Sequence, residues 1–291
     1  MKIIKRLIFS LVTIIALAAV AVIGVYIYVR VNFGIDLFST AGQLKTLSEE
    51  VDEATLCPNR FSDDDLASVK TNMDSKVEGL INYKEGEGYH GYTIDFSALP
   101  NVKDATSPIY FNERQAGALS QMVFEQTTGG VVSIGDGDLA TDILQVDFSE
   151  ISESGSANFN VVAKVELTSF KEKMNGFPFN FFKKYVPDGL YISSTVRVDK
   201  QGEGMDYTLT NKSFCINNLD SNNTSDLFRT LNAVVKIGSA EDLNMAIGST
   251  AVNALIGTKE NPGFAYSLRA LGKKTFSFFA TADGNDCFMI S

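Results

Sequence analysis

The stretch Phe159-Asn-Val-Val-Ala-Lys-Val-Glu-Leu167 places its odd-numbered apolar residues on one face, and Leu190-Tyr-Ile-Ser-Ser-Thr-Val-Arg-Val198 does the same with its even-numbered residues. A period of two residues is typical of a β-strand with one buried face and one solvent-exposed face. Similar alternation occurs in 144–148 and 205–209, and turn residues such as Gln201-Gly-Glu-Gly204 separate these stretches. The pattern therefore predicts a long, curved antiparallel sheet.

Helix signals lie on both sides of this predicted sheet. Ser62-Asp-Asp-Asp65, Asn112-Glu-Arg-Gln115 and Ser239-Ala-Glu-Asp242 each combine an N-cap residue with an acid or amide three residues later. Apolar residues then recur at helical spacing after each of them. Because the helices flank the strands instead of alternating with them, the predicted fold class is α+β, a curved antiparallel sheet packed with helices.

An uncharged apolar run occupies Leu7–Val29, after the cations Lys2, Lys5 and Arg6. At ~1.5 Å per residue, a helix over this run is about 34 Å long, enough to cross a ~30 Å hydrocarbon core. Basic residues before the run favour a cytoplasmic amino terminus. The sequence therefore predicts a single-pass cell-membrane protein whose C-terminal domain is extracytoplasmic.

A cleaved signal peptide is the alternative for this segment. The apolar part of a signal peptide is usually ~7–15 residues, shorter than this run, so we favour a retained anchor. We divide the chain into a cytoplasmic tip and anchor (1–30), a membrane-proximal helical segment (31–88) and an extracytoplasmic α+β domain (89–291). The helical pattern at 40–53 either continues the anchor or packs back on the domain.

The charge of the exported part narrows the class of partner. All 35 acidic residues lie after residue 30, together with 21 of the 25 basic residues, so this part carries a net charge of −14. Such a charge argues against nucleic acid and against a broad anionic lipid surface as partners. A lipid bound in an apolar groove and an envelope protein remain as candidate partners.

No arrangement of residues in the sequence indicates catalysis. His90, in Gly88-Tyr-His-Gly91, is the one histidine, and we interpret it as a loop residue. Gly135-Asp-Gly-Asp138 lacks the ligand spacing of a calcium loop and fits a turn before a strand. Cys57, Cys215 and Cys287 fit buried free thiols better than one disulfide plus a free thiol. We predict no catalytic residue, metal or cofactor.

The segment Phe177-Pro-Phe-Asn-Phe-Phe-Lys-Lys-Tyr-Val-Pro187 combines aromatic residues with two lysines between two predicted strands. The structural interpretation is a crossover that covers the sheet edge. The functional interpretation is an apolar flap that touches lipid, with Lys183 and Lys184 near headgroups. Its candidate ligand-binding residues are Phe177, Phe179, Phe181, Phe182 and Tyr185.

The layout of an anchor, a capped helix after Ile109-Tyr-Phe-Asn-Glu-Arg-Gln-Ala-Gly-Ala-Leu119 and a meander of strands resembles that of a known group of proteins. These are single-pass membrane proteins of Gram-positive bacteria with a TULIP-like or AsmA-like lipid-binding domain. The resemblance covers roughly residues 105–215 and implies a curved sheet folded over an apolar groove. Asn112 stands where such sequences more often have Thr or Ser.

These observations lead to a main hypothesis and two alternatives. The main hypothesis is a membrane-anchored, non-enzymatic module that binds a lipid or another apolar ligand. The first alternative is a structural or interaction protein of the cell envelope that docks a protein partner. A carboxylate enzyme would require two acids that converge in a pocket. An apolar groove leaves inward-facing residues unpacked, whereas a scaffold has a filled core.

Overall fold

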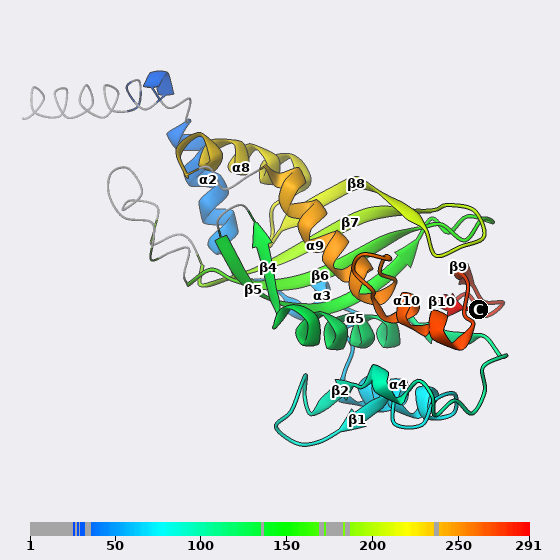
Figure 1. The fold of residues 1–291 in the computed structure, drawn as a ribbon. Coiled ribbons are helices and arrows are strands. Elements are labelled where there is room, and N and C mark those ends of the chain that lie inside the picture. The colour runs from blue at the N-terminus through cyan, green and yellow to red at the C-terminus, as the bar shows by residue number, and fades with distance from the viewer. Residues whose placement is uncertain are drawn as a thin grey trace, which may run out of the picture.

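The computed structural model describes residues 26, 28, 30–32, 36–134, 137–168, 172, 183, 187–235 and 239–291. Its main element is a five-stranded antiparallel sheet in which each strand pairs with the next along the chain (Figure 1). The strands are β4 Val131–Ile134, β5 Gly137–Ser149, β6 Ala157–Glu166, β7 Gly189–Lys200 and β8 Tyr207–Ile216. The predicted α+β fold with a curved antiparallel sheet is therefore confirmed.

The alternation of the sequence decides which face of this sheet is buried. Along β7, Leu190 and Ile192 are buried, whereas Tyr191 and Ser193 are only half-buried. The register shifts between Ile143 and Gln145 in the β5–β6 ladder, and again at Thr195 in the β7–β8 ladder. Such irregularities bend strands and increase their twist, which helps the sheet to curl.

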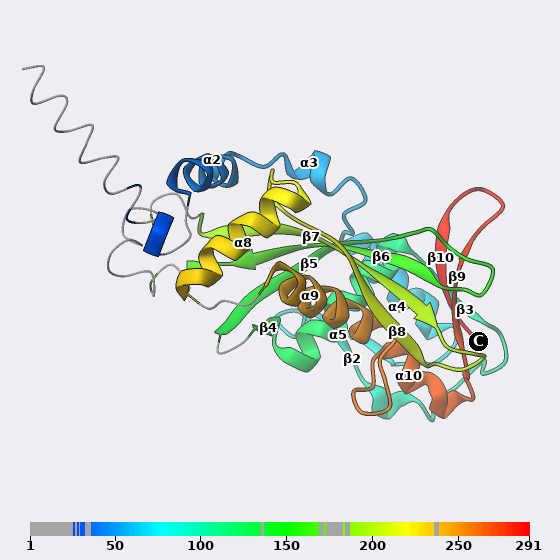
Figure 2. The same cartoon turned by 90° about the horizontal axis from the view of Figure 1, so that it is seen from above.

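Two long helices, α5 Glu113–Thr128 and α9 Ala240–Leu255, pack on the concave face of the sheet (Figures 1 and 2). Both begin with the predicted capping boxes. Asn112 caps α5 together with Gln115, and Ser239 caps α9 together with Asp242. Caps of this kind satisfy amide groups that the first turn of a helix leaves unpaired.

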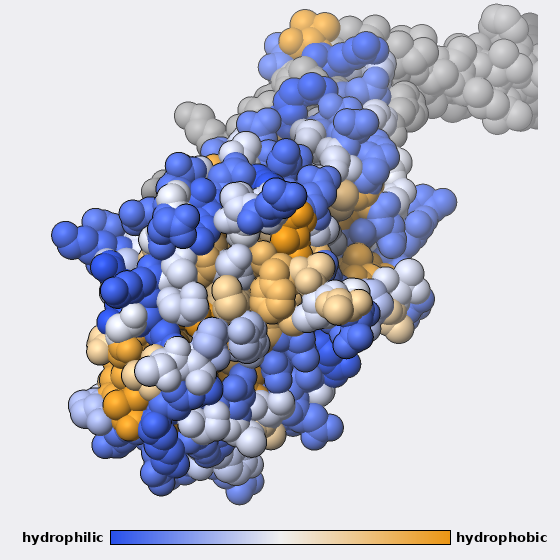
Figure 3. Space-filling model, turned by 90° about the vertical axis from the view of Figure 1, so that its right-hand side faces the viewer, coloured by the Kyte–Doolittle hydropathy of each residue, from blue (hydrophilic) through white to orange (hydrophobic). Residues whose placement is uncertain are grey.

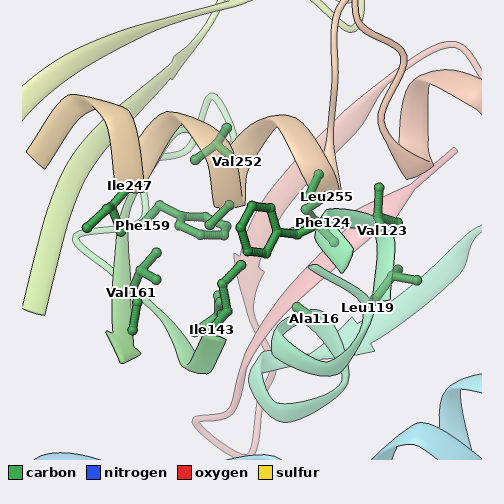
Figure 4. Packing of buried hydrophobic residues seen from close by; sticks show 14 of the residues in the cluster. Ala116, Leu119, Val123, Phe124, Ile143, Phe159, Val161, Ile247, Val252 and Leu255 are labelled. Carbon is green, nitrogen blue, oxygen red and sulfur yellow. The ribbon is translucent and has the colours of Figure 1, made fainter. Parts of the chain in front are cut away.

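The interface between these helices and the sheet is filled by apolar side chains. Figure 4 shows the ring of Phe124 on α5 between α9 and the sheet, with Phe159 on β6 and Leu255 on α9 close to it. Each of these three residues is at most 1% exposed. The concave face is thus the centre of the hydrophobic core.

A three-stranded sheet, in the order β3-β10-β9, covers one end of this core. Its strands are β3 Ile109–Asn112, β9 Phe276–Ala280 and β10 Asp286–Ile290. Phe278 of β9 lies 4.8 Å from Phe148 of β5 and 5.5 Å from Phe288 of β10, measured between ring centroids. The many phenylalanines of the sequence therefore include a packed cluster of rings at this end.

A further layer covers the outer side of α5. It contains α4 Asp63–Asp74, the hairpin of β1 Ile81–Tyr83 and β2 Tyr92–Ile94, and the short helix η1 Phe96–Ala98. Ser62 and Asp65 form the predicted capping box of α4, and the expected stripe of Leu66, Val69 and Met73 is buried. This layer forms the lower part of the molecule in Figure 1.

The membrane-proximal segment packs back on the domain over α2 Leu37–Ser48. Leu44 and Leu47 are 1% and 4% exposed, and the Asn217 side chain donates a hydrogen bond to the Leu47 carbonyl at 2.8 Å. The chain then crosses the convex face through α3 Glu53–Leu56, on the opposite side of the sheet from α9 (Figure 2). The remaining elements are α8 Ser221–Val235, α10 Phe264–Ser267 and η3 Leu268–Leu271.

Most of the predicted anchor lies outside the described residues, so the membrane span stays a prediction. Within the described part of the chain, the helices are too short or too polar to cross a membrane. The division of the chain at residue 88 also stays a prediction. Residues on both sides of it, such as Leu66 and Phe288, belong to one continuous core.

Candidate functional site

The concave face of the sheet is where a TULIP-like groove was expected. In the described structure this face is occupied by the protein's own helices, α5 and α9. Gly248 of α9 lies so close to β7 that an added Cβ would overlap the Val196 side chain. A ligand on this face would have to displace a helix from the sheet.

The five aromatic residues predicted to bind a ligand, Phe177, Phe179, Phe181, Phe182 and Tyr185, lie outside the described residues. The residues on either side of this segment are described. Leu167 and Asp188 meet where its ends leave the sheet, since the Leu167 amide donates a hydrogen bond to the Asp188 carbonyl at 2.6 Å. Asn217 connects this end of the sheet to α2, because its amide bonds to the Tyr191 carbonyl and its side chain to the Leu47 carbonyl.

An open pocket of about 810 Å³ lies on the convex side, between α3 and Tyr191. Glu50, Asp52 and Glu53 contribute carboxylates to its lining. Asp52 caps α3, and the hydrogen bond from Thr55 lowers the pKa of Asp52. Glu53 pairs with Arg60 and accepts a hydrogen bond from the Tyr191 hydroxyl at 3.0 Å. Two of the three acids therefore have structural partners, and a general acid would need a raised pKa instead.

One carboxyl group does have a raised pKa. Burial, and then the nearby charges of Asp147 and Asp286, raise the pKa of Glu113 to about 7. Glu113 is the first residue of α5 and accepts a hydrogen bond from the Phe148 amide of β5 at 2.6 Å. Because β4 ends before this point, the bond covers the free edge of β5 and serves the fold.

The cysteines and the histidine are also not arranged for nucleophilic catalysis. None of the three cysteines forms a disulfide; Cys57 and Cys287 are buried and Cys215 is half-buried. His90 lies in a turn, as predicted, and its Nδ1 is 2.7 Å from the Asp63 carboxylate. Within the described residues, no group of three or more His, Cys, Asp or Glu side chains is placed to hold a metal ion.

A cluster of aromatic rings that includes an exposed tyrosine lies on the β1–β2 hairpin. Tyr83 and Tyr92 are opposite each other on the two strands, with ring centroids 5.0 Å apart. Tyr83 is 58% exposed. The chain between the strands folds back through a tight turn at His90 and Gly91, both with positive φ. A Cβ at Gly91 would lie 2.7 Å from the Tyr83 ring, so glycine permits this close approach.

Two more rings extend this aromatic cluster. Tyr89 stacks on His90 at 4.3 Å and meets Phe61 edge-on at 6.2 Å. Burial, and then the charge of Asp142, raise the pKa of Tyr89 to about 12, so its hydroxyl stays neutral at physiological pH. We define the tyrosine surface as Tyr83, Tyr89, His90 and Tyr92.

The charges near the tyrosine surface are mainly negative. Besides burial, the negative charges of Asp63 and Asp64 help to raise the pKa of Tyr92. In the same way, those of Asp63, Asp142 and Glu125 help to raise the pKa of Tyr89. The nearby cations have other partners, because Arg60 pairs with Glu53, Lys70 with Asp74, and Lys84, the residue after Tyr83, with Glu87. The exposed ring of Tyr83, beside an excess of carboxylates, is suited to a cationic group, which aromatic faces also attract.

The sequence pattern draws attention to His90 but not to the tyrosine surface around it. The alternation of Tyr92-Thr-Ile94 predicted only β2, and its partner β1 is three residues long. The available signal in the sequence for this surface is the closely spaced set of Tyr83, Tyr89 and Tyr92.

The chain matches no known protein family, no curated protein and no solved structure.

Proposed function

We propose that this chain is a non-enzymatic interaction protein, held at the membrane through residues 7–29, whose extracytoplasmic domain docks a protein partner. The observation that carries the proposal is the filled concave face. Phe124, Phe159 and Leu255 are packed between the sheet and its helices, so the main apolar face is used for folding. A filled core there is what a scaffold requires.

The tyrosine surface is the docking surface that we propose. Tyrosine is enriched among the residues that dominate binding energy at protein interfaces, since it offers a large ring with little entropy to lose. The surrounding acids favour a partner segment rich in lysine or arginine. The same charges oppose an anionic lipid headgroup or a nucleic acid.

Binding of a short peptide by the full-length chain tests this proposal. The probe is a twelve-residue lysine- and arginine-rich peptide, with a glutamate-rich peptide of equal length as its counterpart, measured by calorimetry. Tyr83→Ala should weaken binding of the basic peptide about tenfold, since a hot-spot residue contributes more than ~1 kcal/mol. The matched control is Tyr110→Ala, because Tyr110 is also an exposed strand tyrosine with a ring partner, Phe279, at 5.7 Å.

Equal loss of affinity in the two variants, or equal binding of the acidic peptide, would contradict the proposed surface. Added salt should weaken the binding, because exposed charges are screened over about 8–10 Å at 0.1–0.15 M ionic strength.

Figure 3 shows the end of the molecule that carries β9 and β10, where apolar residues lie in separate groups between hydrophilic ones.

Lipid binding is the second candidate function, and one observation favours it. The segment that contains the predicted residues Phe177–Tyr185 leaves and re-enters the sheet at Leu167 and Asp188, and α2, which follows the predicted anchor, contacts this part of the sheet through Leu47 at its C-terminal end. A membrane anchor before α2 would therefore be separated from this end of the domain by little more than the length of α2, about 18 Å. Native mass spectrometry of the full-length chain, with lipid extraction of the same sample, tests it: a stoichiometric lipid lost in Phe181→Ser/Phe182→Ser supports this function.

A further inference from the structure

Other described segments cover one edge of the five-stranded sheet and leave the other edge uncovered. On the β4–β5 side, amides that point away from β6 have acceptors in other segments. The Ile143 amide bonds to Gln121 Oε1 at 2.7 Å, and the Phe148 amide bonds to Glu113 Oε1 at 2.6 Å. The α5 side chains therefore close this edge against pairing with another strand.

The β8 edge has no such cover within the described part of the chain. Backbone groups of residues 207–213 bond to no described segment other than β7. The Gln201 amide bonds to the Asp206 carbonyl, so by antiparallel alternation Thr208 and Thr210 also bond to β7. The N–H and C=O groups of Tyr207, Leu209 and Asn211 then point outward, at the upper edge of the sheet in Figure 1.

We infer that β8 pairs with β8 of a second copy of this chain, antiparallel and centred on Leu209. In this register Leu209 faces Leu209 of the other copy. Thr208 faces Thr210 of the other copy, and Asp206 faces Lys212 of the other copy. The outward backbone groups of residues 207, 209 and 211 in the two copies then meet one another. Such pairing joins the two sheets into one across a two-fold axis.

Charge complementarity between Asp206 and Lys212 supports a second copy of this chain as the partner of β8. Asp206 and Lys212 are both exposed, and neither forms an ion pair with a described residue. The proposed register gives each of them a partner of opposite charge, twice by symmetry, and Thr–Thr and opposite-charge cross-strand pairs are favourable.

Sedimentation of the full-length chain in detergent, over a range of protein concentrations, tests the inference. The unmodified chain should dimerise reversibly. Lys212→Asp should raise the dimer dissociation constant roughly tenfold, since it replaces two attractive pairs with two repulsive ones. Asp206→Lys/Lys212→Asp should restore dimerisation. Lys259→Asp, an equal charge change at an exposed loop residue, should have no effect.

Monomers at all concentrations, or a dimer that Lys212→Asp leaves unchanged, would overturn the inference. The second result would assign the contact to another surface, such as the predicted anchor. Disulfide formation gives an independent readout of the register in a Cys215→Ser background. Thr208→Cys/Thr210→Cys places thiols on facing positions with Cα atoms about 4.5 Å apart and should cross-link, whereas Thr208→Cys alone should not. Equal cross-linking by the two variants would contradict this register.

Discussion

The carboxylate of Glu113 accepts a hydrogen bond from the amide of Phe148 at 2.6 Å and thereby joins the start of α5 to the free edge of β5. The same carboxyl group is half-buried, and this burial, followed by the charges of Asp147 and Asp286, raises its pKa to about 7. The carboxyl group that joins α5 to β5 is therefore also a group whose pKa lies near neutrality. The fold should therefore respond to pH near neutrality.

Glu113→Gln should remove this response. An acid whose pKa is raised from 4.5 to about 7 by folding stabilises the fold fully below pH 4.5, and this contribution is lost as the pH rises to about 7. Glutamine keeps the acceptor oxygen without a charge. Relative to the unmodified protein, the free energy of unfolding of the variant should rise by about 1–2 kcal/mol between pH 5 and 7.5, less than ~1.4 kcal/mol per pKa unit because the group is partly solvated.

Urea titrations at the two pH values measure the difference. Glu203→Gln is the control, since Glu203 is exposed in the β7–β8 turn. A variant whose stability relative to the unmodified chain is the same at pH 5 and 7.5 would show that Glu113 does not titrate in this range.

Two helical glycines should respond in opposite ways to replacement by alanine. At Gly248 of α9 the added methyl group would overlap Val196 Cγ1 and lie 3.1 Å from Ser194 Oγ. At Gly42 of α2 no atom lies within 4 Å of the added group. Gly248→Ala should cost about 1–3 kcal/mol by overpacking, and Gly42→Ala should stabilise by about 0.5–1 kcal/mol through helix propensity. Thermal unfolding of both variants checks the contrast, and a harmless Gly248→Ala would argue that α9 is not seated tightly on the sheet.

The three cysteines should differ in their reactivity towards a maleimide at pH 7.5. Burial and the charge of Asp147 raise the pKa of Cys57 to about 11, and burial also raises the pKa of Cys287. Since the thiolate is the reactive form, these two should be labelled only when the protein unfolds. Cys215 is half-buried and should be labelled in the folded protein. Mass spectrometry after a short exposure measures this, and rapid labelling that persists in Cys215→Ser would contradict it.

The long strands and the capped helices could be predicted from the sequence because their signals are local. A period of two over 159–167 and 190–198 leaves few alternatives, and the capping residues Asn112 and Ser239 do mark the starts of α5 and α9. The short strands β1, β3, β4 and β10 have three to five residues each, which is too few for a clear alternating pattern, and β3 pairs with β10 far along the chain. Such strands are stabilised by tertiary packing, so local patterns do not reveal them.

The tyrosine surface and the occupied concave face could not be predicted for the same reason. An alternating strand shows that one of its faces is buried, but it does not show what covers that face. Here the cover includes α9, whose sequence lies more than forty residues after β7 begins. Likewise, Tyr83 and Tyr92 face each other only because Gly91 allows the chain to fold back.

The measurement that most directly tests the proposed function is photo-crosslinking of the full-length chain in living cells. A benzophenone amino acid replaces Tyr83 in one variant and Tyr110 in the other, since both positions are exposed on strands. Our account predicts a discrete protein adduct from position 83 that is absent from position 110. Lipid adducts from position 83, or the same protein adducts from both positions, would contradict it.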